Sequence, residues 1–287
     1  MKTFLFLITL IISGYSCSTD DTSNITNTEK EIAKDSVITN IAYGDHSLQT
    51  YDLFLPEERF KTPAKVVVLV HGGGWTTGDK ADMAPIQQLI QGKNNNFAIA
   101  NINYVLADSM TKAFPNQVND LVKAVTHLTD NATAYKITPE FAFVGVSAGA
   151  HLSMLYSYSF DTDSKVKAVC SVVGPADFTD PNYLNEPLYV NAFPFLVADF
   201  NPENVALLQQ ISPSFQVTKN SPPTLLFYGN QDSLIPNSQH ESLKLALDTK
   251  GVINELTVYN GGHGNWDASS FLDLDAKLNA FLTEFLK

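Results

Sequence analysis

The chain has 287 residues, of which 44% are hydrophobic and 17% charged, a composition typical of a soluble globular protein with one large domain. Its 18 Lys and Arg residues stand against 30 Asp and Glu residues, so the formal net charge is -12. Because a phosphate backbone binds basic surfaces, this balance excludes nucleic acid as a partner.

The first 16 residues are predicted to be a signal peptide. Lys2 precedes a hydrophobic run over residues 4–12, which is shorter than the roughly 20 residues that a membrane-spanning helix needs. Gly14 and Ser16 supply small residues before Cys17, as signal cleavage requires. The segment also resembles the lipobox of bacterial lipoproteins. That resemblance implies a lipid on Cys17 as the only membrane attachment, in the periplasm or at the cell surface; the alternative is a freely secreted protein.

Residues 17–35 are predicted to form a flexible tether. Ser, Thr, Asp and Asn dominate this stretch, and it has almost no large apolar side chains. Such a segment cannot bury enough surface to offset the entropy lost on ordering. The globular domain is therefore expected over residues 36–287.

Within this domain, short apolar runs alternate with segments of helical periodicity. Two strands, over residues 37–43 and 48–55, are expected to open the sheet as an antiparallel pair. Further strands are predicted at 65–70, 97–104, 141–146, 166–173, 224–229 and 255–259, and helices at 83–91, after Pro115, after Ser147, and at 238–250 and 271–286. Cys170 is expected to be a buried strand thiol. The alternation predicts an α/β fold whose central sheet is mostly parallel, with helices on both faces.

The alternation breaks at residues 178–210, which we predict to be a small cap insertion. Aromatic side chains are frequent in this segment. They could line an acyl or aromatic pocket, or they could pack the insertion onto the sheet, and the sequence leaves both interpretations open.

Residues 141–151 carry the clearest chemical motif. An apolar strand ends in Gly145-Val-Ser147-Ala-Gly149, and a segment that favours a helix follows. This strand–turn–helix order is typical of the nucleophile elbow, in which the serine projects out of the sheet and the glycines relieve crowding. Ser147 is thus the candidate nucleophile.

A serine hydroxyl needs a base to accept its proton, and a carboxylate to hold the base in the right tautomer. His263 lies in a glycine-rich loop after the last predicted strand, and Asp232 follows the strand at 224–229. Open α/β sheets build their sites at these carboxyl ends of strands, so Asp232 and His263 are the expected acid and base. Asp267 is a rival acid, but it lies too near His263 in sequence to face it easily.

Negative charge on a substrate carbonyl oxygen requires N–H donors. His71-Gly72-Gly73-Gly74-Trp75 follows a buried strand, and its glycines let the backbone approach an oxyanion. Ala148, directly after the serine, supplies the other donor. We expect His71 to hold this loop by hydrogen bonds, and His151 to pack at the helix without acting as a base.

Together these residues resemble α/β-hydrolases of the hormone-sensitive-lipase type and their bacterial carboxylesterase and feruloyl-esterase-like relatives, over about residues 36–287. The resemblance is carried by the motifs at 71–75, 78–80, 114–115, 145–151, 232–236 and 262–264. It implies Ser147 as nucleophile, His263 as general base and acid, and Asp232 as its orienting carboxylate. It also implies Gly73, Gly74 and Ala148 as the oxyanion donors.

The expected function is that of an extracytoplasmic serine hydrolase that needs neither metal nor cofactor and cleaves a carboxylic ester through an acyl-enzyme. Acetyl or feruloyl groups on plant polysaccharide are suggested as substrates by analogy alone. A peptidase or amidase on the same fold is one alternative. A non-catalytic binding module is the other.

Overall fold

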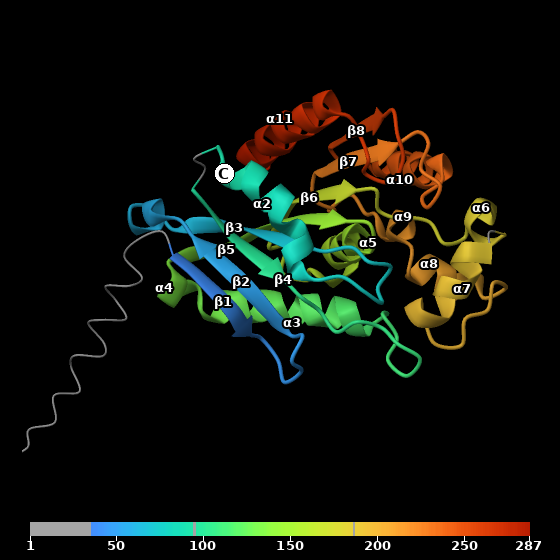
Figure 1. The fold of residues 1–287 in the computed structure, drawn as a ribbon, viewed down its shortest axis with the longest axis horizontal. Coiled ribbons are helices and arrows are strands. Elements are labelled where there is room, and N and C mark those ends of the chain that lie inside the picture. Colours follow the sequence, from blue (N-terminus) through green and yellow to red (C-terminus); the bar gives the residue numbers. More distant parts are fainter. Residues whose placement is uncertain (1–35, 94–95, 186) are drawn as a thin grey trace, which may run out of the picture.

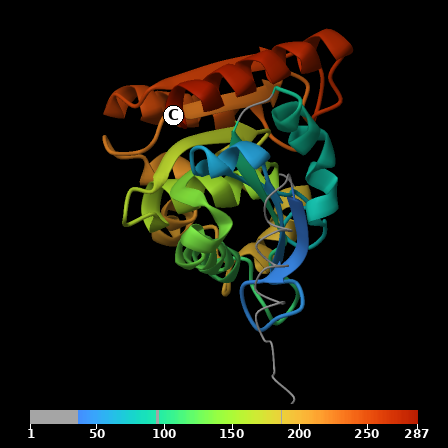
Figure 2. The same cartoon turned by 90° about the vertical axis from the view of Figure 1, so that its left-hand side faces the viewer.

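The computed structural model describes residues 36–93, 96–185 and 187–287, which form one twisted sheet with helices on both faces (Figures 1 and 2). The expected signal peptide and tether lie outside the described residues. The strands are β1 (Ser36–Ala42), β2 (Thr50–Leu55), β3 (Ala64–Val70), β4 (Phe97–Ile102), β5 (Ile137–Val146), β6 (Val166–Val172), β7 (Thr224–Gly229) and β8 (Asn254–Tyr259).

The strand order is β1-β2-β4-β3-β5-β6-β7-β8. β2 pairs antiparallel with both β1 and β4, and every later pair in this order is parallel. The expected α/β fold with a mostly parallel sheet is therefore confirmed, as is the antiparallel pair that opens it. Central strands such as β4 and β7 are buried along their whole length, which explains their continuous apolar runs.

Helices connect the strands. They are α2 (Ala84–Gln91), α3 (Asn116–Asp130), α4 (Ala132–Tyr135), α5 (Ala148–Leu155), α6 (Pro181–Leu184), α7 (Pro187–Leu196), α8 (Val205–Gln210), α9 (Pro213–Gln216), α10 (Asn237–Lys250) and α11 (Ala268–Phe285). Short 3-10 turns η1 (Glu57–Phe60) and η2 (Lys80–Met83), and a π-helical turn η3 (Tyr156–Phe160), complete the description. None of the helices in the described residues is long and apolar enough to cross a membrane.

The two faces of the sheet bury separate cores. In β3, Val66, Val68 and Val70 join one core with α3, α5 and α10, whereas Val67 and Leu69 join the other with α2 and α11. Alternate side chains of a strand point to opposite faces, so a strand buried on both sides must be apolar throughout. Figure 2 shows α2 and α11 together on one side of the sheet. Cys170 of β6 is buried in the second core, as expected.

Residues 178–210, the cap segment, form α6, α7 and α8, which lie to the right of the sheet in Figure 1. Phe178 is fully buried and contacts the rings of Tyr183 and Phe193, and Phe193 stacks on Phe200 at 4.5 Å. These aromatic side chains belong to the same core as α3 and α5. Most of the cap aromatics therefore pack the segment onto the body of the molecule.

Candidate active site

Ser147 lies in a sharp turn between β5 and α5. Its backbone has φ 54° and ψ -121°, a conformation that a residue with a side chain rarely adopts. Its N–H donates to the carbonyl oxygen of Val172 at 2.8 Å, which fixes the turn against β6. The hydroxyl is thereby held above the carboxyl end of the sheet, as the strand–turn–helix pattern predicts.

The two glycines of the motif are explained by close approach of backbones. A Cβ atom on Gly145 would lie 2.4 Å from the carbonyl oxygen of Gly149, and one on Gly149 would lie 2.2 Å from that of Val70. Both distances are far below van der Waals contact. The motif thus lets α5 begin directly against the ends of β5 and β3.

The structure brings Ser147, His263 and Asp232 together, although they are far apart in sequence. The Ser147 hydroxyl lies 2.9 Å from Nε2 of His263, and Nδ1 of His263 lies 2.7 Å from Oδ2 of Asp232. His263 comes from the loop after β8 and Asp232 from the loop after β7. These loops meet because Gly229 has no side chain: a Cβ there would lie 2.2 Å from the carbonyl oxygen of Gly262.

The hydrogen bonds around Asp232 select the tautomer of His263. The Asp232 side chain is fully buried, and its Oδ1 accepts hydrogen bonds from the backbone N–H groups of Leu234 and Ile235 at 2.8 and 3.0 Å. A buried carboxylate is stable only when such donors satisfy it. An ionised Asp232 must accept from Nδ1–H of His263, which leaves Nε2 unprotonated toward the Ser147 hydroxyl.

The other acids and histidines that the sequence offered lie elsewhere. Asp267 caps the N-terminus of α11, where it accepts from the N–H of Ser270 at 2.7 Å. His71 is buried, its ring stacks on Tyr104 with the centroids 4.2 Å apart, and Nδ1 lies 2.7 Å from the carbonyl oxygen of Gly72. His151 is buried in α5 and directs both nitrogens away from the Ser147 hydroxyl, to partners described below.

The glycine loop after β3 lies beside the elbow. A Cβ on Gly72 would lie 3.2 Å from Cβ of Ser147, so this loop passes directly over the serine. Gly73 and Gly74 have φ 109° and 55°, which glycine adopts without strain, and the space next to the Gly74 Cα is open. Ala148 is the first residue of α5, so its N–H has no partner within the helix. Gly74 and Ala148 thus line the same cavity as Ser147, and Gly73 lies in the loop between Gly72, which contacts the serine, and Gly74.

The geometry of the glycine loop depends on the segment that follows it. Asp79 caps η2 by accepting from the N–H of Ala81, and Asn103 donates to it at 2.8 Å. The buried Lys80 ammonium contacts Asp52 of β2 at 2.5 Å and Asn40 of β1 at 2.6 Å. The motif at 78–80 therefore fastens the glycine loop to the antiparallel edge of the sheet.

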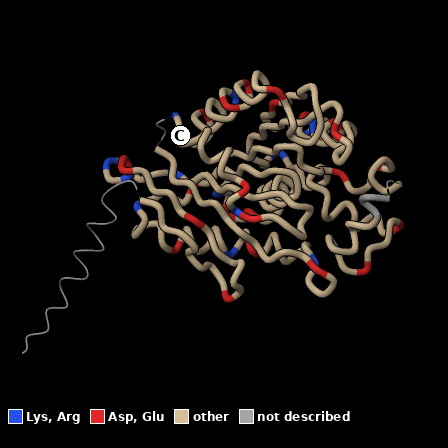
Figure 3. The backbone as a smooth tube through the Cα atoms, viewed as in Figure 1, with Lys and Arg blue, Asp and Glu red and all other residues tan. Residues whose placement is uncertain are grey.

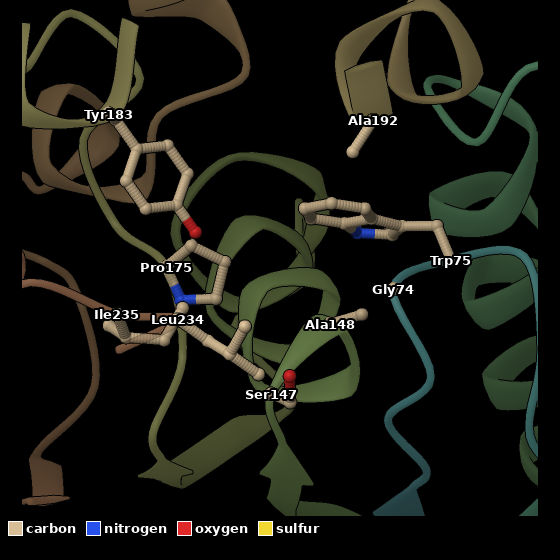
Figure 4. Close-up of a pocket in the computed structure, with 9 residues that line it drawn as sticks. All are labelled: Gly74, Trp75, Ser147, Ala148, Pro175, Tyr183, Ala192, Leu234 and Ile235. Carbon is tan, nitrogen blue, oxygen red and sulfur yellow. The ribbon is translucent and has the colours of Figure 1, made fainter. Parts of the chain in front are cut away.

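A cavity of about 200 Å³ opens at Ser147. Figure 4 shows the serine hydroxyl pointing into the space that Trp75, Tyr183 and Leu234 enclose. The cavity is lined by Gly74, Trp75, Ser147, Ala148, Pro175, Tyr183, Ala192, Leu234 and Ile235. None of these side chains carries a charge, so the cavity suits an uncharged, largely apolar group.

The sequence analysis assigned Gly74, Ser147 and Ala148 of this cavity and left the role of the cap aromatics open, but it did not assign the other lining residues. Leu234 and Ile235 lie in a loop without periodicity, and their place beside Ser147 follows from their backbone bonds to Asp232. Of the cap aromatics, Tyr183 reaches the cavity. Trp75 directly follows the glycines, but no sequence pattern predicts that its ring lines the cavity. Among the residues described, no group of three or more His, Cys, Asp or Glu is placed to hold a metal ion.

Comparison with known proteins identifies the family of the chain. The family model described as BD-FAE matches residues 51–247. The chain is 26% identical over 244 residues to the esterase LipC of Mycobacterium tuberculosis, covering 78% of this chain and 59% of LipC. It is 25% identical over 249 residues to isoprenylcysteine alpha-carbonyl methylesterase ICME of Arabidopsis thaliana, covering 77% and 55%. The chain therefore spans little more than half the length of these relatives.

Among solved structures, a truncated carbohydrate esterase from gut microbiota superimposes with a TM-score of 0.73 at 26% identity. The match covers 88% of this chain and 98% of that one. The family model spans well over half of the chain. The chain thus belongs to the BD-FAE family of α/β-hydrolase esterases.

Proposed function

We propose that this protein is a serine esterase that hydrolyses carboxylic esters through an acyl-enzyme on Ser147. The observation that carries the proposal is the continuous hydrogen-bonded chain from the Ser147 hydroxyl through His263 to the buried Asp232. A serine, an imidazole and a carboxylate in this order are the parts that nucleophilic acyl transfer requires. A module that only binds its ligand has no need of this arrangement.

In the first half of the reaction, Nε2 of His263 accepts the hydroxyl proton while Oγ of Ser147 attacks the ester carbonyl carbon. The tetrahedral intermediate then collapses, the bond to the alcohol oxygen breaks, and Nε2–H donates its proton to that oxygen. In the second half, His263 takes a proton from water, the hydroxide attacks the acyl carbon, and Ser147 recovers its proton as the acid leaves. Asp232 stays ionised throughout and stabilises the imidazolium.

The intermediate places negative charge on the former carbonyl oxygen. We assign its stabilisation to the backbone N–H groups of Gly73, Gly74 and Ala148. One such donor is worth about 3 to 4 kcal/mol in a serine protease. The hydroxyl-bearing residue itself is not a donor, because the Ser147 N–H is already bonded to Val172.

We further propose that the substrates are esters of plant polysaccharide with acetyl or feruloyl groups. An uncharged cavity of about 200 Å³ suits such acyl groups. The similarity to a protein described as a carbohydrate esterase from gut microbiota supports the sugar-linked alcohol. An exported enzyme would meet such polymers outside the cell.

Export and anchoring form a separate part of the proposal. We propose that the signal peptide is removed before Cys17 and that a lipid on Cys17 attaches the protein to a membrane. The support is the sequence around Cys17. Membrane fractionation of cells that carry Cys17→Ser tests it, because the variant should move to the soluble fraction. Unchanged membrane association would contradict the lipid anchor.

The esterase proposal is tested with a panel of p-nitrophenyl esters, p-nitroanilides, and acetylated and feruloylated saccharides. The wild type should hydrolyse esters and form a mass adduct with a phosphonate that reacts with active-site serines. Ser147→Ala should lose the adduct and reduce kcat by a factor on the order of 10⁶. A folded Ser147→Ala variant with undiminished turnover would contradict the mechanism, and preference for the anilides would indicate an amidase.

A further inference from the structure

His151 has a partner at each ring nitrogen. The indole Nε1–H of Trp75 lies 3.2 Å from Nδ1, and the carbonyl oxygen of Ile211 lies 2.8 Å from Nε2. The side chain is completely buried in α5, one turn after Ser147. Its ring meets those of Trp75 and Phe178 edge to face, with centroids 5.5 and 5.1 Å apart.

These two partners determine the protonation of the ring. An indole N–H can only donate and a carbonyl oxygen can only accept, so Nδ1 must be bare and Nε2 must carry the proton. Burial agrees with a neutral ring, because it lowers the pKa of His151 to about 4. With both nitrogens occupied, His151 holds its neighbours in place and does not move protons.

One neighbour is part of the glycine loop. Trp75 has φ 65°, a left-handed conformation that is strained for a residue with a bulky side chain. Such a conformation persists only when surrounding contacts hold it. The Trp75 carbonyl oxygen accepts from the Ala107 N–H at 2.9 Å and from Nε2 of Gln117 at 2.7 Å, and its indole donates to His151. Trp75 directly follows Gly74, so these bonds also fix the backbone of a proposed oxyanion donor.

The other neighbour belongs to the end of the cap. Ile211 directly follows α8, and Ser212 next to it joins the two ends of the cap segment. The Ser212 hydroxyl accepts from the N–H of Phe178 at 2.7 Å and donates to the carbonyl oxygen of Leu208 at 2.6 Å. His151 therefore lies where the nucleophile helix, the glycine loop and both ends of the cap meet.

We infer that His151 is a positioning residue that fixes the oxyanion loop and the cap relative to Ser147, through its bonds to Trp75 and Ile211. This inference rests on the proposed esterase activity. The bond to Trp75 sets the geometry of the loop when the intermediate forms, so its loss affects kcat. The cavity keeps its uncharged lining, so the effect on KM is smaller.

Three variants separate this role from simple packing. His151→Phe keeps a buried ring without polar atoms, and Trp75→Phe removes the indole donor. His151→Asn restores an acceptor near the position of Nδ1. We expect kcat to fall about tenfold in each Phe variant, the effect of one buried hydrogen bond, and to recover in His151→Asn. The double Phe variant should lose no more than His151→Phe alone, since Trp75→Phe removes a bond that His151→Phe has already removed.

His127→Phe is the matched control. It removes another histidine bond, between Nδ1 and the Tyr51 hydroxyl at 2.8 Å, on α3. It should lower the free energy of unfolding and leave kcat unchanged. A folded His151→Phe or Trp75→Phe variant with wild-type kcat would overturn the inference, as would Phe effects that multiply in the double variant. Should His151→Phe not fold, a wild-type kcat in the Trp75→Phe variant would still overturn the inference.

A second readout does not depend on turnover. The chain has two Trp residues, so an NMR spectrum shows two indole N–H signals, and Trp75→Phe identifies that of Trp75. This proton should exchange slowly with solvent in the wild type and His151→Asn, and faster in His151→Phe. Equal exchange in all three would refute the Trp75–His151 bond. Protected exchange in a protein that hydrolyses no ester would instead count against the proposed function.

Discussion

Three N–H groups surround the buried Asp232 carboxylate: those of Leu234, Ile235 and the His263 ring. The two backbone donors hold the carboxylate in one orientation, and the third bond selects the tautomer of His263. The function of Asp232 in the proposed reaction therefore depends on its being an acceptor only. A side chain of the same shape that also donates should fail in this role.

Asp232→Asn tests this point. The Asn amide can donate an N–H to Nδ1 of His263. The ring then carries its proton on Nε2, which faces the serine as a donor and can no longer accept the hydroxyl proton. We expect kcat to fall by about 10⁴-fold while the fold is kept, as the same change does in a serine protease. Kinetics on a p-nitrophenyl ester, with circular dichroism to verify folding, measure the effect.

Asp267→Asn is the control for Asp232→Asn. It alters the N-cap of α11 and should leave kcat unchanged, at a cost of no more than about 1 kcal/mol of stability. The reverse result, with activity lost at Asp267 and kept at Asp232, would show that the rival acid serves His263.

The roles of Ser147, Asp232 and His263 could be predicted from the sequence because each residue follows the end of a recognisable strand. Ser147 carries a glycine motif, Asp232 follows β7, and His263 follows β8. The bonds of His151 could not be predicted in the same way. Its partner Ile211 lies 60 positions away in a segment without periodicity, and only the folded chain brings the two together.

The start of α5 depends on how closely it approaches β3. A Cβ on Gly149 would lie 2.2 Å from the carbonyl oxygen of Val70, so the helix can begin this close to the strand ends only with glycine at this position. Gly149→Ala should lower the free energy of unfolding by about 1 to 3 kcal/mol through overpacking, and should reduce kcat by displacing Ser147. Urea denaturation and kinetics report the two effects separately.

Gly92→Ala is the matched control for Gly149→Ala. Gly92 ends α2 with φ -64°, and a Cβ there would lie 3.3 Å from its nearest neighbour, the carbonyl oxygen of Gln88. An added methyl group there needs a shift of only a few tenths of an ångström, so it should cost less than at Gly149. Equal destabilisation by both substitutions would show that the close approach of Gly149 is not the cause.

The connection from η2 to the edge strands depends on a buried charge. The Lys80 side chain is 9% exposed and bonds to Asp52 and Asn40. Lys80→Met leaves Asp52 without its cation, so we expect a loss of about 1 to 3 kcal/mol in the free energy of unfolding.

Lys61 forms a surface pair with Glu58, and its side chain is 78% exposed. Lys61→Met should cost well under 1 kcal/mol. Similar losses from the two substitutions would contradict this account.

The order of strands and helices was predictable because burial on both faces forces continuous apolar runs. β3, β4, β6 and β7 are of this kind. The cap segment was not predictable in detail. Phe193 packs in the core while Tyr183 of the same segment reaches the cavity, and this difference depends on tertiary partners that composition does not reveal.

Charge is distributed over the whole fold. In the residues drawn in colour, Lys and Arg positions are scattered singly among Asp and Glu positions (Figure 3). Several surface carboxylates, such as Asp108 and Asp248, have a pKa lowered by hydrogen bonds. These groups take up protons only below their ordinary range. Among the described residues, the groups whose shifted pKa bears on the interval between about pH 6.5 and pH 4 are His71, His151 and His240.

Three buried histidines should make the molecule less stable in that interval. Burial lowers the pKa of His71, His151 and His240. Hydrogen bonds and nearby carboxylates raise these pKa values again, but by less than burial lowers them. The unfolded chain takes up protons below about pH 6.5, whereas folded His151 does so only near pH 4. The unfolded state thus binds more protons in between, and the free energy of unfolding must fall as the pH falls.

For His151 alone the loss amounts to about 3 kcal/mol between pH 6.5 and pH 4. Urea denaturation of the wild type and His151→Asn over this range should show a shallower decline in the variant, whose side chain does not titrate. A variant at His151 that kept the wild-type slope would mean that the folded protein accepts a proton on this ring, and so that the Trp75 and Ile211 bonds do not hold it neutral.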